Sequence, residues 1–329
     1  MRVLVTGGAG YIGSHTVSLL RSRGDHVVIL DSMELGFKEA VRDTPLVVGN
    51  TRDEELVRSV LREHKLDSVI HFAAYKAAGE SVGNPGKYFD NNVFGTMQLL
   101  EAMRKENVRR LVFSSTAAVY GNPQVLPVNE SAALRPENPY GESKLLVEKM
   151  LPWYDGAFGL KSVALRYFNA AGAIMDGSMG EDPRYAQNLI PLVMKAATGR
   201  QPTIKVFGTD YPTPDGTCIR DYIHVLDLGA AHLAALDHLV AKESSDIFNL
   251  GTGKGASVKE VLDITTRISG APIPTDWVAR RAGDPVSVYA DNTKARNVLG
   301  WNPRYGIEDI ISSAWKWQSG HPDGWKTGT

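Results

Sequence analysis

The stretch Gly7-Gly8-Ala9-Gly10-Tyr11-Ile12-Gly13 decides how this chain of 329 residues folds. It directly follows the apolar run Val3-Leu4-Val5, which predicts a strand, and it opens a segment with helical periodicity. Glycines at this spacing let a backbone approach a pyrophosphate, and the N-terminus of a helix supplies free N–H groups and a partial positive charge. The stretch therefore predicts a dinucleotide-binding turn through Gly7, Gly10 and Gly13. The alternative is a glycine turn without a ligand.

Asp31 ends the second apolar run, at the place where a carboxylate can accept hydrogen bonds from the ribose hydroxyls of a dinucleotide. A carboxylate there repels a 2′-phosphate, and the following Ser32-Met33 brings no cation beside it. The sequence therefore predicts NAD rather than NADP as the cofactor. The alternative interpretation makes Asp31 a cap at the end of a strand.

Strand and helix signals alternate through the N-terminal half of the chain. Helix-length segments separate most of the apolar runs, and the apolar side chains of residues 53–64 fall on one helical face. Near-continuous apolar strands joined by helices predict a parallel sheet covered on both faces, which is an α/β doubly wound (Rossmann) fold. The predicted strands lie at residues 3–5, 27–30, 46–48, 69–70 and 111–113.

The pattern changes after about residue 170, where loops rich in glycine and proline begin. Fewer strand signals separate the helices there, which predicts a second, smaller α/β domain over the strand ends of the first. We expect an NAD-binding domain at residues 1–170 and a substrate domain at residues 171–329, with the chain crossing between them. Residues 320–329 are expected to form a frayed tail. The predicted helices of this part lie at residues 186–198, 225–240, 257–268 and 306–318.

Composition argues against several classes of function. Thirty-six Lys and Arg residues against 37 Asp and Glu residues give a net charge of −1, so nucleic-acid binding has no electrostatic support. A single cysteine, Cys218, cannot form an intrachain disulfide or a metal-ligand set, so we expect a reducing compartment and no metal. No window approaches about 18 apolar residues, so no membrane contact is expected. These observations together predict a cytoplasmic protein.

Tyr140 and Lys144 are four residues apart and follow Pro139, a residue that favours the start of a helix. This spacing puts both side chains on one helical face, so the Lys144 ammonium is expected near the Tyr140 phenol. A free tyrosine has a pKa of about 10 and is a poor base near neutral pH. A nearby cation and the nicotinamide charge would favour the phenolate and make Tyr140 a usable acid or base. Taken alone, the spacing is also that of an ordinary surface pair.

The predicted fifth strand ends in Ser114-Ser115-Thr116, where such a fold presents reactive groups. The glycine turn, these hydroxyls and the Tyr-Lys spacing together resemble the extended branch of the short-chain dehydrogenase/reductase family. Further segments extend the resemblance over nearly the whole chain, toward the members that epimerise UDP-sugars at carbon 4. These segments are His71–Ser81, Tyr88–Val93, Leu165–Asn169 and Gly216–Val225.

The resemblance implies NAD as the cofactor, a UDP-sugar as the substrate and a homodimer as the assembly. In the implied reaction, Tyr140 takes the proton of the 4-hydroxyl while hydride passes to NAD. The resulting 4-keto sugar turns in its pocket and receives the hydride on its other face, which interconverts UDP-galactose and UDP-glucose. Lys144 and Thr116 complete the implied catalytic set. The helices near residues 88–105 and 140–154 are expected to pack against their copies in the dimer.

The resemblance also assigns binding residues. Those implied to contact NAD are Gly7, Gly10, Tyr11, Ile12, Gly13, Asp31, Asn50, Thr51, Phe72, Ala73, Ala74, Lys76, Asn91, Ser114, Tyr140, Lys144 and Phe168. Those implied to contact the UDP-sugar are Lys76, Thr116, Tyr140, Asn169, Asn188, Leu189, Lys205, Val206, Phe207, Arg220, Arg281, Asp284 and Val288. Guanidinium groups suit pyrophosphate oxygens, although on spacing alone Arg220 and Arg281 could be solvated surface residues. On spacing alone, Asn169 and Asn188 could equally form turns or helix caps.

Several positions depart from the usual pattern of this family. Asn50-Thr51 replaces an acidic and an aliphatic residue beside the adenine, so Asn50 would accept a hydrogen bond without charge assistance. Val288 replaces a tyrosine that restricts many relatives to unsubstituted hexoses, so we expect UDP-GalNAc and UDP-GlcNAc to be accepted too. Ala117 and Ala118 stand where related dehydratases carry an Asp-Glu acid/base pair. The alternatives left open are a dehydratase or reductase of nucleotide sugars and a non-catalytic NAD-binding regulator.

Overall fold

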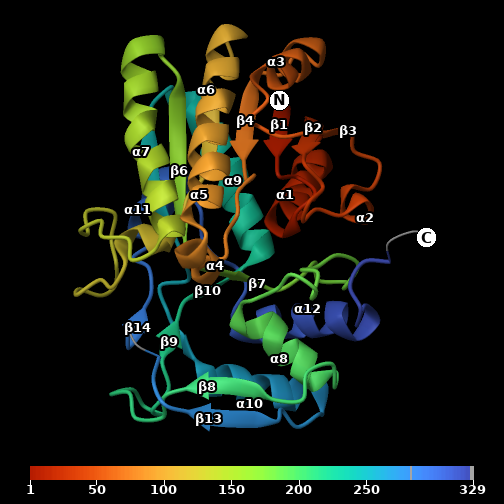
Figure 1. Ribbon diagram of the computed structural model, residues 1–329, viewed down its shortest axis with the longest axis vertical. Coiled ribbons are helices and arrows are strands. Elements are labelled where there is room, and N and C mark those ends of the chain that lie inside the picture. The colour runs from red at the N-terminus through yellow and green to blue at the C-terminus, as the bar shows by residue number, and fades with distance from the viewer. Residues whose placement is uncertain (282–283, 327–329) are drawn as a thin grey trace.

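The computed structural model describes residues 1–281 and 284–326 (Figure 1). Within these ranges, seven parallel strands form a central sheet in the order β11-β6-β5-β4-β1-β2-β3. The sheet grows outward from β1 in both directions, so the predicted doubly wound α/β fold is confirmed. Its strands are β1 (Arg2–Thr6), β2 (His26–Asp31), β3 (Leu46–Val48), β4 (Ser68–His71), β5 (Arg110–Ser114), β6 (Lys161–Tyr167) and β11 (Asp246–Leu250).

Alternate residues of β1 explain why both faces of this sheet are covered. Val3 and Val5 pack into one apolar cluster and Leu4 packs into another on the opposite face, and all three side chains are fully buried. The first cluster is covered by α1 (Tyr11–Ser22), α2 (Lys38–Val41), α9 (Val225–Lys242) and α11 (Thr293–Leu299). The second is covered by α3 (Glu54–Glu63), α6 (Gly95–Lys105) and α7 (Pro139–Phe158).

The start of α7 is fixed by its own sequence. Asn138 caps the helix by accepting a 2.9 Å hydrogen bond from the Gly141 N–H, and Pro139 occupies the first helical position. Tyr140 therefore lies in the first turn and Lys144 lies one turn later. The short elements on either side of this start are α4 (Ala78–Gly83), α5 (Pro85–Tyr88), the π-helix η1 (Phe89–Phe94) and the 3₁₀-helix η2 (Ala117–Tyr120).

A smaller group of elements, here called the cap region, lies below the carboxyl ends of the strands in Figure 1. It consists of α8 (Leu189–Ala197), β8 (Ile204–Phe207), α10 (Val258–Ser269) and α12 (Ile307–Gly320), which share one apolar core, and of β13 (Thr275–Val278), which pairs with β8. The short strands β7 (Asn169–Ala171), β9 (Ile219–Arg220), β10 (Tyr222–His224), β12 (Ala256–Ser257) and β14 (Ser287–Val288) accompany it. The division of the chain into domains at residue 170 stays a prediction.

The last described residues are held in place. The Trp325 N–H donates a 2.9 Å hydrogen bond to Asp182, and the ring centroid of Trp325 lies 4.6 Å from that of Trp317 in α12. The predicted frayed tail is therefore wrong for residues 320–326, because a buried carboxylate and an aromatic face fix this segment. Residues 327–329 lie outside the described residues. No helix in the described ranges is long and apolar enough to cross a membrane.

Candidate functional site

The glycine turn between β1 and α1 is packed so closely that it leaves no room for a side chain at Gly7 or Gly13. Gly7 has a φ of +71°, and a Cβ there would lie 2.6 Å from the Ala73 nitrogen. A Cβ at Gly13 would lie 2.2 Å from the Gly7 carbonyl oxygen. Because the first N–H groups of a helix lack partners within the helix, this close-packed turn presents donors to an anion at its surface. The turn therefore fits the pyrophosphate of a dinucleotide.

Asp31 caps the chain at the end of β2 and can still bind a ligand. Its two carboxylate oxygens accept 2.9 Å hydrogen bonds from the N–H groups of Ala9 and Met33, and its burial raises its pKa. Each oxygen has a further lone pair for a ribose hydroxyl. On the adenine side, the Asn50 side-chain oxygen accepts a 2.9 Å bond from the Arg52 N–H, so this amide is engaged within its own turn.

Tyr140 and Thr116 form the centre of the site. Thr116 is 8% exposed and caps η2 by accepting a 3.1 Å hydrogen bond from the Ala118 N–H. Burial raises the pKa of Tyr140, and the Thr116 hydroxyl and the positive charge of Lys76 oppose this rise. The arrangement suits a phenol that exchanges one proton with a bound hydroxyl.

Lys144 lies deeper in the protein. Its buried ammonium donates a 2.9 Å hydrogen bond to the Ser114 carbonyl oxygen and lies 4.9 Å from the centroid of the Phe113 ring. Burial lowers the pKa of Lys144 to about 7, against the attraction of Glu148. The cation whose charge lowers the pKa of Tyr140 is Lys76, which lies between β4 and α4. The structure thus adds a second lysine, Lys76, to the charges that act on Tyr140, and the role predicted for Lys144 stays a prediction.

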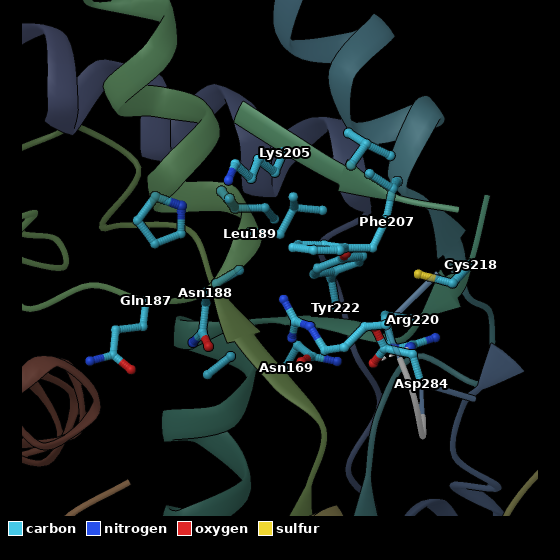
Figure 2. A pocket seen from close by; sticks show the side chains of 17 residues that line it. Asn169, Gln187, Asn188, Leu189, Lys205, Phe207, Cys218, Arg220, Tyr222 and Asp284 are labelled. Carbon is cyan, nitrogen blue, oxygen red and sulfur yellow. Dashed lines mark hydrogen bonds and ion pairs between the residues drawn. The ribbon is translucent and has the colours of Figure 1, made fainter. Parts of the chain in front are cut away.

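A cavity of about 250 Å³ opens between β7, β8, β9 and α8 (Figure 2). It brings together many residues that the sequence assigned to the UDP-sugar, namely Asn169, Asn188, Leu189, Lys205, Val206, Phe207, Arg220, Arg281 and Asp284. Gln187, Cys218 and Tyr222 also line it, although no local sequence signal indicated this. Lys76, Thr116, Tyr140 and Val288 are not among the described residues that line this cavity.

The cavity walls carry the groups that a nucleoside diphosphate requires. The Arg281 guanidinium lies 4.3 Å from the centroid of the Phe207 ring, which provides an aromatic face beside a positive charge. Arg220 donates a 2.9 Å hydrogen bond to the Pro285 carbonyl and lies 3.5 Å from Asp284. Asn188 precedes α8, and its side chain makes no capping bond within the described structure, which leaves its amide facing the cavity (Figure 2).

An apolar cluster lies between the cavity and Thr116. Val288, Phe168 and Ala117, the residue after Thr116, each pack against one buried core of Val119, Tyr120, Val128 and Leu145. Val288 is also the register partner of Arg220 in the pairing of β14 with β9, and Phe168 precedes Asn169 of the cavity. The proposed sugar end of the site thus adjoins its diphosphate end.

The remaining residues assigned to NAD lie around the carboxyl ends of β3 to β6. The Ser114 hydroxyl forms a 2.6 Å hydrogen bond with the Tyr167 hydroxyl, and the Asn91 amide donates a 3.1 Å bond to Asn92. Tyr11 donates a 2.6 Å bond to the Gly172 carbonyl. The other members of this group are Ile12 at the start of α1, Thr51 after β3, and Phe72, Ala73 and Ala74 after β4.

Glu181 is a functional candidate that the sequence did not reveal. Its carboxylate accepts a 2.8 Å hydrogen bond from the Lys76 ammonium, across 105 residues of sequence. Glu181 lies in a loop rich in glycine and proline, whose composition suggested solvated chain. Only the fold places this carboxylate beside Lys76.

Comparisons with known proteins agree with this geometry. A family profile described as GDP-mannose 4,6 dehydratase matches residues 4–314. A UDP-glucose 4-epimerase from Halalkalibacterium halodurans is 48% identical over 99% of this chain and 98% of its own length. The solved UDP-glucose 4-epimerase of Bifidobacterium longum in complex with NAD+ and UDP is 42% identical, covers 99% of this chain and 100% of its own, and has a TM-score of 0.93. The UDP-Glc/GlcNAc 4-epimerase of Campylobacter jejuni is 41% identical, covers 97% and 99%, and has a TM-score of 0.86.

Proposed function

The chain belongs to the UDP-glucose 4-epimerase family of extended short-chain dehydrogenases/reductases, whose cofactor is NAD, and from this premise we propose that it interconverts UDP-galactose and UDP-glucose. The reaction would proceed by reversible oxidation at sugar carbon 4 through a 4-keto intermediate. The observation that carries the proposal is the buried Tyr140 phenol whose pKa Thr116 lowers, with Thr116 one residue from the apolar cluster that adjoins the diphosphate cavity.

NAD fits the residues present. The close approach of Gly7 to Ala73 leaves room for a pyrophosphate at the start of α1, and Asp31 has lone pairs for the adenosine ribose. When bound, NAD supplies an acceptor for the hydrogen on carbon 4 and returns it in the second half of the reaction. The Ser114 carbonyl fixes the Lys144 ammonium at the carboxyl end of β5, on the expected nicotinamide side.

Tyr140 moves the proton in this proposal. Its phenolate takes the proton of the sugar 4-hydroxyl, and the resulting phenol gives it back when the keto group is reduced. Burial favours the phenol, whereas Thr116 and Lys76 favour the phenolate, so the residue can act in both directions. Arg220 and Arg281 would hold the diphosphate while the keto sugar turns between its two faces.

Neither alternative accounts for the site as well. Dehydration requires an acid to expel a hydroxyl, yet the residues after Thr116 are Ala117 and Ala118, which begin η2. A regulator that merely binds NAD has no need of a buried tyrosine whose pKa is lowered by a nearby hydroxyl and a cation. An epimerase uses both features.

The test is an assay of purified protein with UDP-galactose and no added NAD. We expect UDP-glucose as the product, without net formation of NADH, because the cofactor is regenerated in each turnover. The Tyr140→Phe variant is expected to lose about 10²- to 10⁴-fold in kcat while it keeps its affinity for UDP. Release of NADH would indicate a dehydrogenase, loss of water would indicate a dehydratase, and unchanged activity of Tyr140→Phe would refute the catalytic assignment.

We also propose that UDP-GalNAc and UDP-GlcNAc are substrates. Val288 shares an apolar cluster with Ala117 and Phe168 at the expected sugar end, where its small side chain would leave space for an N-acetyl group. The Campylobacter jejuni relative, named for both types of sugar, shares the fold. Turnover of UDP-GalNAc at a rate comparable to UDP-galactose supports the proposal, and inertness toward it refutes it.

We propose further that the protein acts in the cytoplasm. We also propose that a second copy of the chain covers α6 and α7. Trp153 of α7 is 78% exposed, and Phe158, Phe94 and Met97 also expose large apolar surfaces on α7, η1 and α6. An apolar surface of this kind suits an isologous dimer. Light scattering should give twice the mass of the chain, and Trp153→Glu should reduce it to the monomer value; a wild-type monomer would exclude the dimer.

A further inference from the structure

The ion pair between Lys76 and Glu181 joins the two sides of the site. Its nitrogen and oxygen lie 2.8 Å apart, and the Glu181 side chain is only 11% exposed whereas that of Lys76 is 52% exposed. A carboxylate so deeply covered requires a partner, and Lys76 is the only cation paired with it in the part of the chain that the structure describes. Lys76 follows β4, and Glu181 lies between β7 and α8.

Glu181 is rigidly held from behind by the C-terminal helix and the segment after it. A Cβ at Gly180 would lie 2.4 Å from the Trp317 ring, and the Trp317 indole donates a 2.8 Å hydrogen bond to the Glu181 carbonyl. The next residue, Asp182, accepts a 2.9 Å bond from the Trp325 N–H. The backbone on both sides of Glu181 is therefore fixed, while the Glu181 carboxylate points the other way, to Lys76.

Lys76 is mobile by nature unless it is paired. It has a flexible four-carbon stem with an ammonium group that can point in many directions, so a partner is needed to fix its position. Paired with Glu181, the ammonium lies 5.9 Å from the centroid of the Tyr11 ring, beside the glycine turn. From this position its charge acts on the Tyr140 phenol.

We propose that Glu181 is a positioning residue that holds the Lys76 ammonium beside Tyr11 and within electrostatic reach of Tyr140. The inference rests on the proposed function and adds to it a residue that acts through Lys76 alone. It also gives the C-terminal segment, through Trp317 and Asp182, an indirect role in the chemistry.

A double-mutant cycle with UDP-galactose tests this role. Glu181→Gln keeps the size of the side chain and removes its charge, and is expected to lower kcat about 10- to 100-fold with KM changed less than about twofold. Because Glu181 acts through Lys76, the Glu181→Gln/Lys76→Met double variant should be no slower than Lys76→Met alone. Glu181→Asp retains the charge and should recover part of the loss.

The matched control is Glu63→Gln, which makes the same change at an exposed carboxylate at the end of α3 and should leave kcat unchanged. A Glu181→Gln variant as fast as wild type would overturn the inference. Losses that add in the double variant, accompanied by a lower melting temperature, would show a merely structural role and also overturn it.

A second readout separates this inference from the proposed epimerase reaction. In protein labelled with ¹⁵N-lysine, the Lys76 ammonium signal is assigned by its absence in Lys76→Met. We expect that signal to shift and weaken in Glu181→Gln, because the ammonium exchanges faster with water when it is unpaired. An unchanged signal overturns the inference even if the enzyme is active, and a wild-type protein inactive on UDP-galactose overturns the proposed function while the signal still reports on the pair.

Discussion

The Lys144 ammonium donates a 2.9 Å hydrogen bond to the Ser114 carbonyl oxygen and thereby ties α7 to the end of β5. The lysine is 3% exposed, and its burial lowers its pKa to about 7 from an ordinary value of 10.5. Between these two pH values the unfolded chain binds the proton that the folded protein has lost. The stability contributed at this position therefore rises with pH across that window, and the cost of the buried charge is greatest below about pH 7.

Replacing Lys144 with methionine should show this cost. Lys144→Met removes the charge, so its melting temperature relative to wild type should be most favourable near about pH 6 and should fall as the pH rises toward about 10. Thermal unfolding at several pH values measures the difference. Lys149→Met, at an exposed position of the same helix, serves as the control. A difference that does not depend on pH would contradict the stated burial of charge.

Much of the fold could be predicted because its signals are local. Strands β1 to β5 carry unbroken apolar runs, and α3 has one apolar face, so periodicity alone locates them. Strand β6 was not among the predicted strands, because Arg166 interrupts its apolar pattern. That arginine is buried and pairs with Glu148 of α7, a contact that no local signal reveals.

The residues of the candidate site also fall into those that local patterns predict and those that only the fold brings together. The glycine turn and the Tyr-Lys spacing are local patterns, whereas the contact between Lys76 and Glu181 exists only after the two loops meet. Spacing on a helix correctly places Tyr140 and Lys144 one turn apart, but it does not specify which group each side chain reaches. The Lys144 ammonium reaches the Ser114 carbonyl, a partner that helical periodicity cannot indicate.

Removing the Thr116 hydroxyl should change the pH dependence of catalysis. The Thr116 hydroxyl lowers the pKa of Tyr140, so Thr116→Val should raise that pKa. Because the base must be deprotonated, the acidic limb of the kcat profile should move to higher pH. Lys76, Tyr88 and Tyr167 also interact with Tyr140 and are unchanged in this variant. Thr116→Ser should keep the wild-type profile; a Thr116→Val profile that coincides with wild type would exclude the role.

Adding a methyl group at Gly7 should disrupt the dinucleotide turn. The Cβ would lie 2.6 Å from the Ala73 nitrogen, on a backbone with a φ of +71°. We expect Gly7→Ala to retain much less NAD through purification and to melt at a lower temperature. Gly24→Ala is a matched control, since Gly24 has a φ of +91° and nothing within 4 Å of the added atom. Equal NAD content in the two variants would show that the close approach at Gly7 does not govern NAD binding.

Arg281 should contribute to UDP affinity and its neighbour should not. Arg281 lines the cavity over Phe207, whereas Arg280 forms a 2.7 Å hydrogen bond with Asp210 and lies over Tyr211. A charge-assisted hydrogen bond is worth about 1.5–3 kcal/mol, so Arg281→Ala should raise the Kd of UDP roughly 10- to 100-fold. Calorimetric titration of both alanine variants decides the matter, and equal affinities would remove Arg281 from the proposed site.

The size of residue 288 should set the choice between plain and N-acetylated sugars. Val288 shares an apolar cluster with Ala117 and Phe168. Its backbone carbonyl accepts a 3.1 Å hydrogen bond from the Asp221 N–H, so the position of the residue is fixed by β14 and not by its side chain. A tyrosine introduced there would therefore project its ring into the space that we assign to the N-acetyl group. We expect Val288→Tyr to lose at least about tenfold in kcat/KM for UDP-GalNAc while kcat/KM for UDP-galactose changes less than about threefold. Val288→Ile, which adds a single methylene, is the control and should accept both sugars. Equal losses on the two substrates would mean that the tyrosine disturbs β14 rather than the pocket, and the preserved use of UDP-GalNAc would show that the acetyl group lies elsewhere.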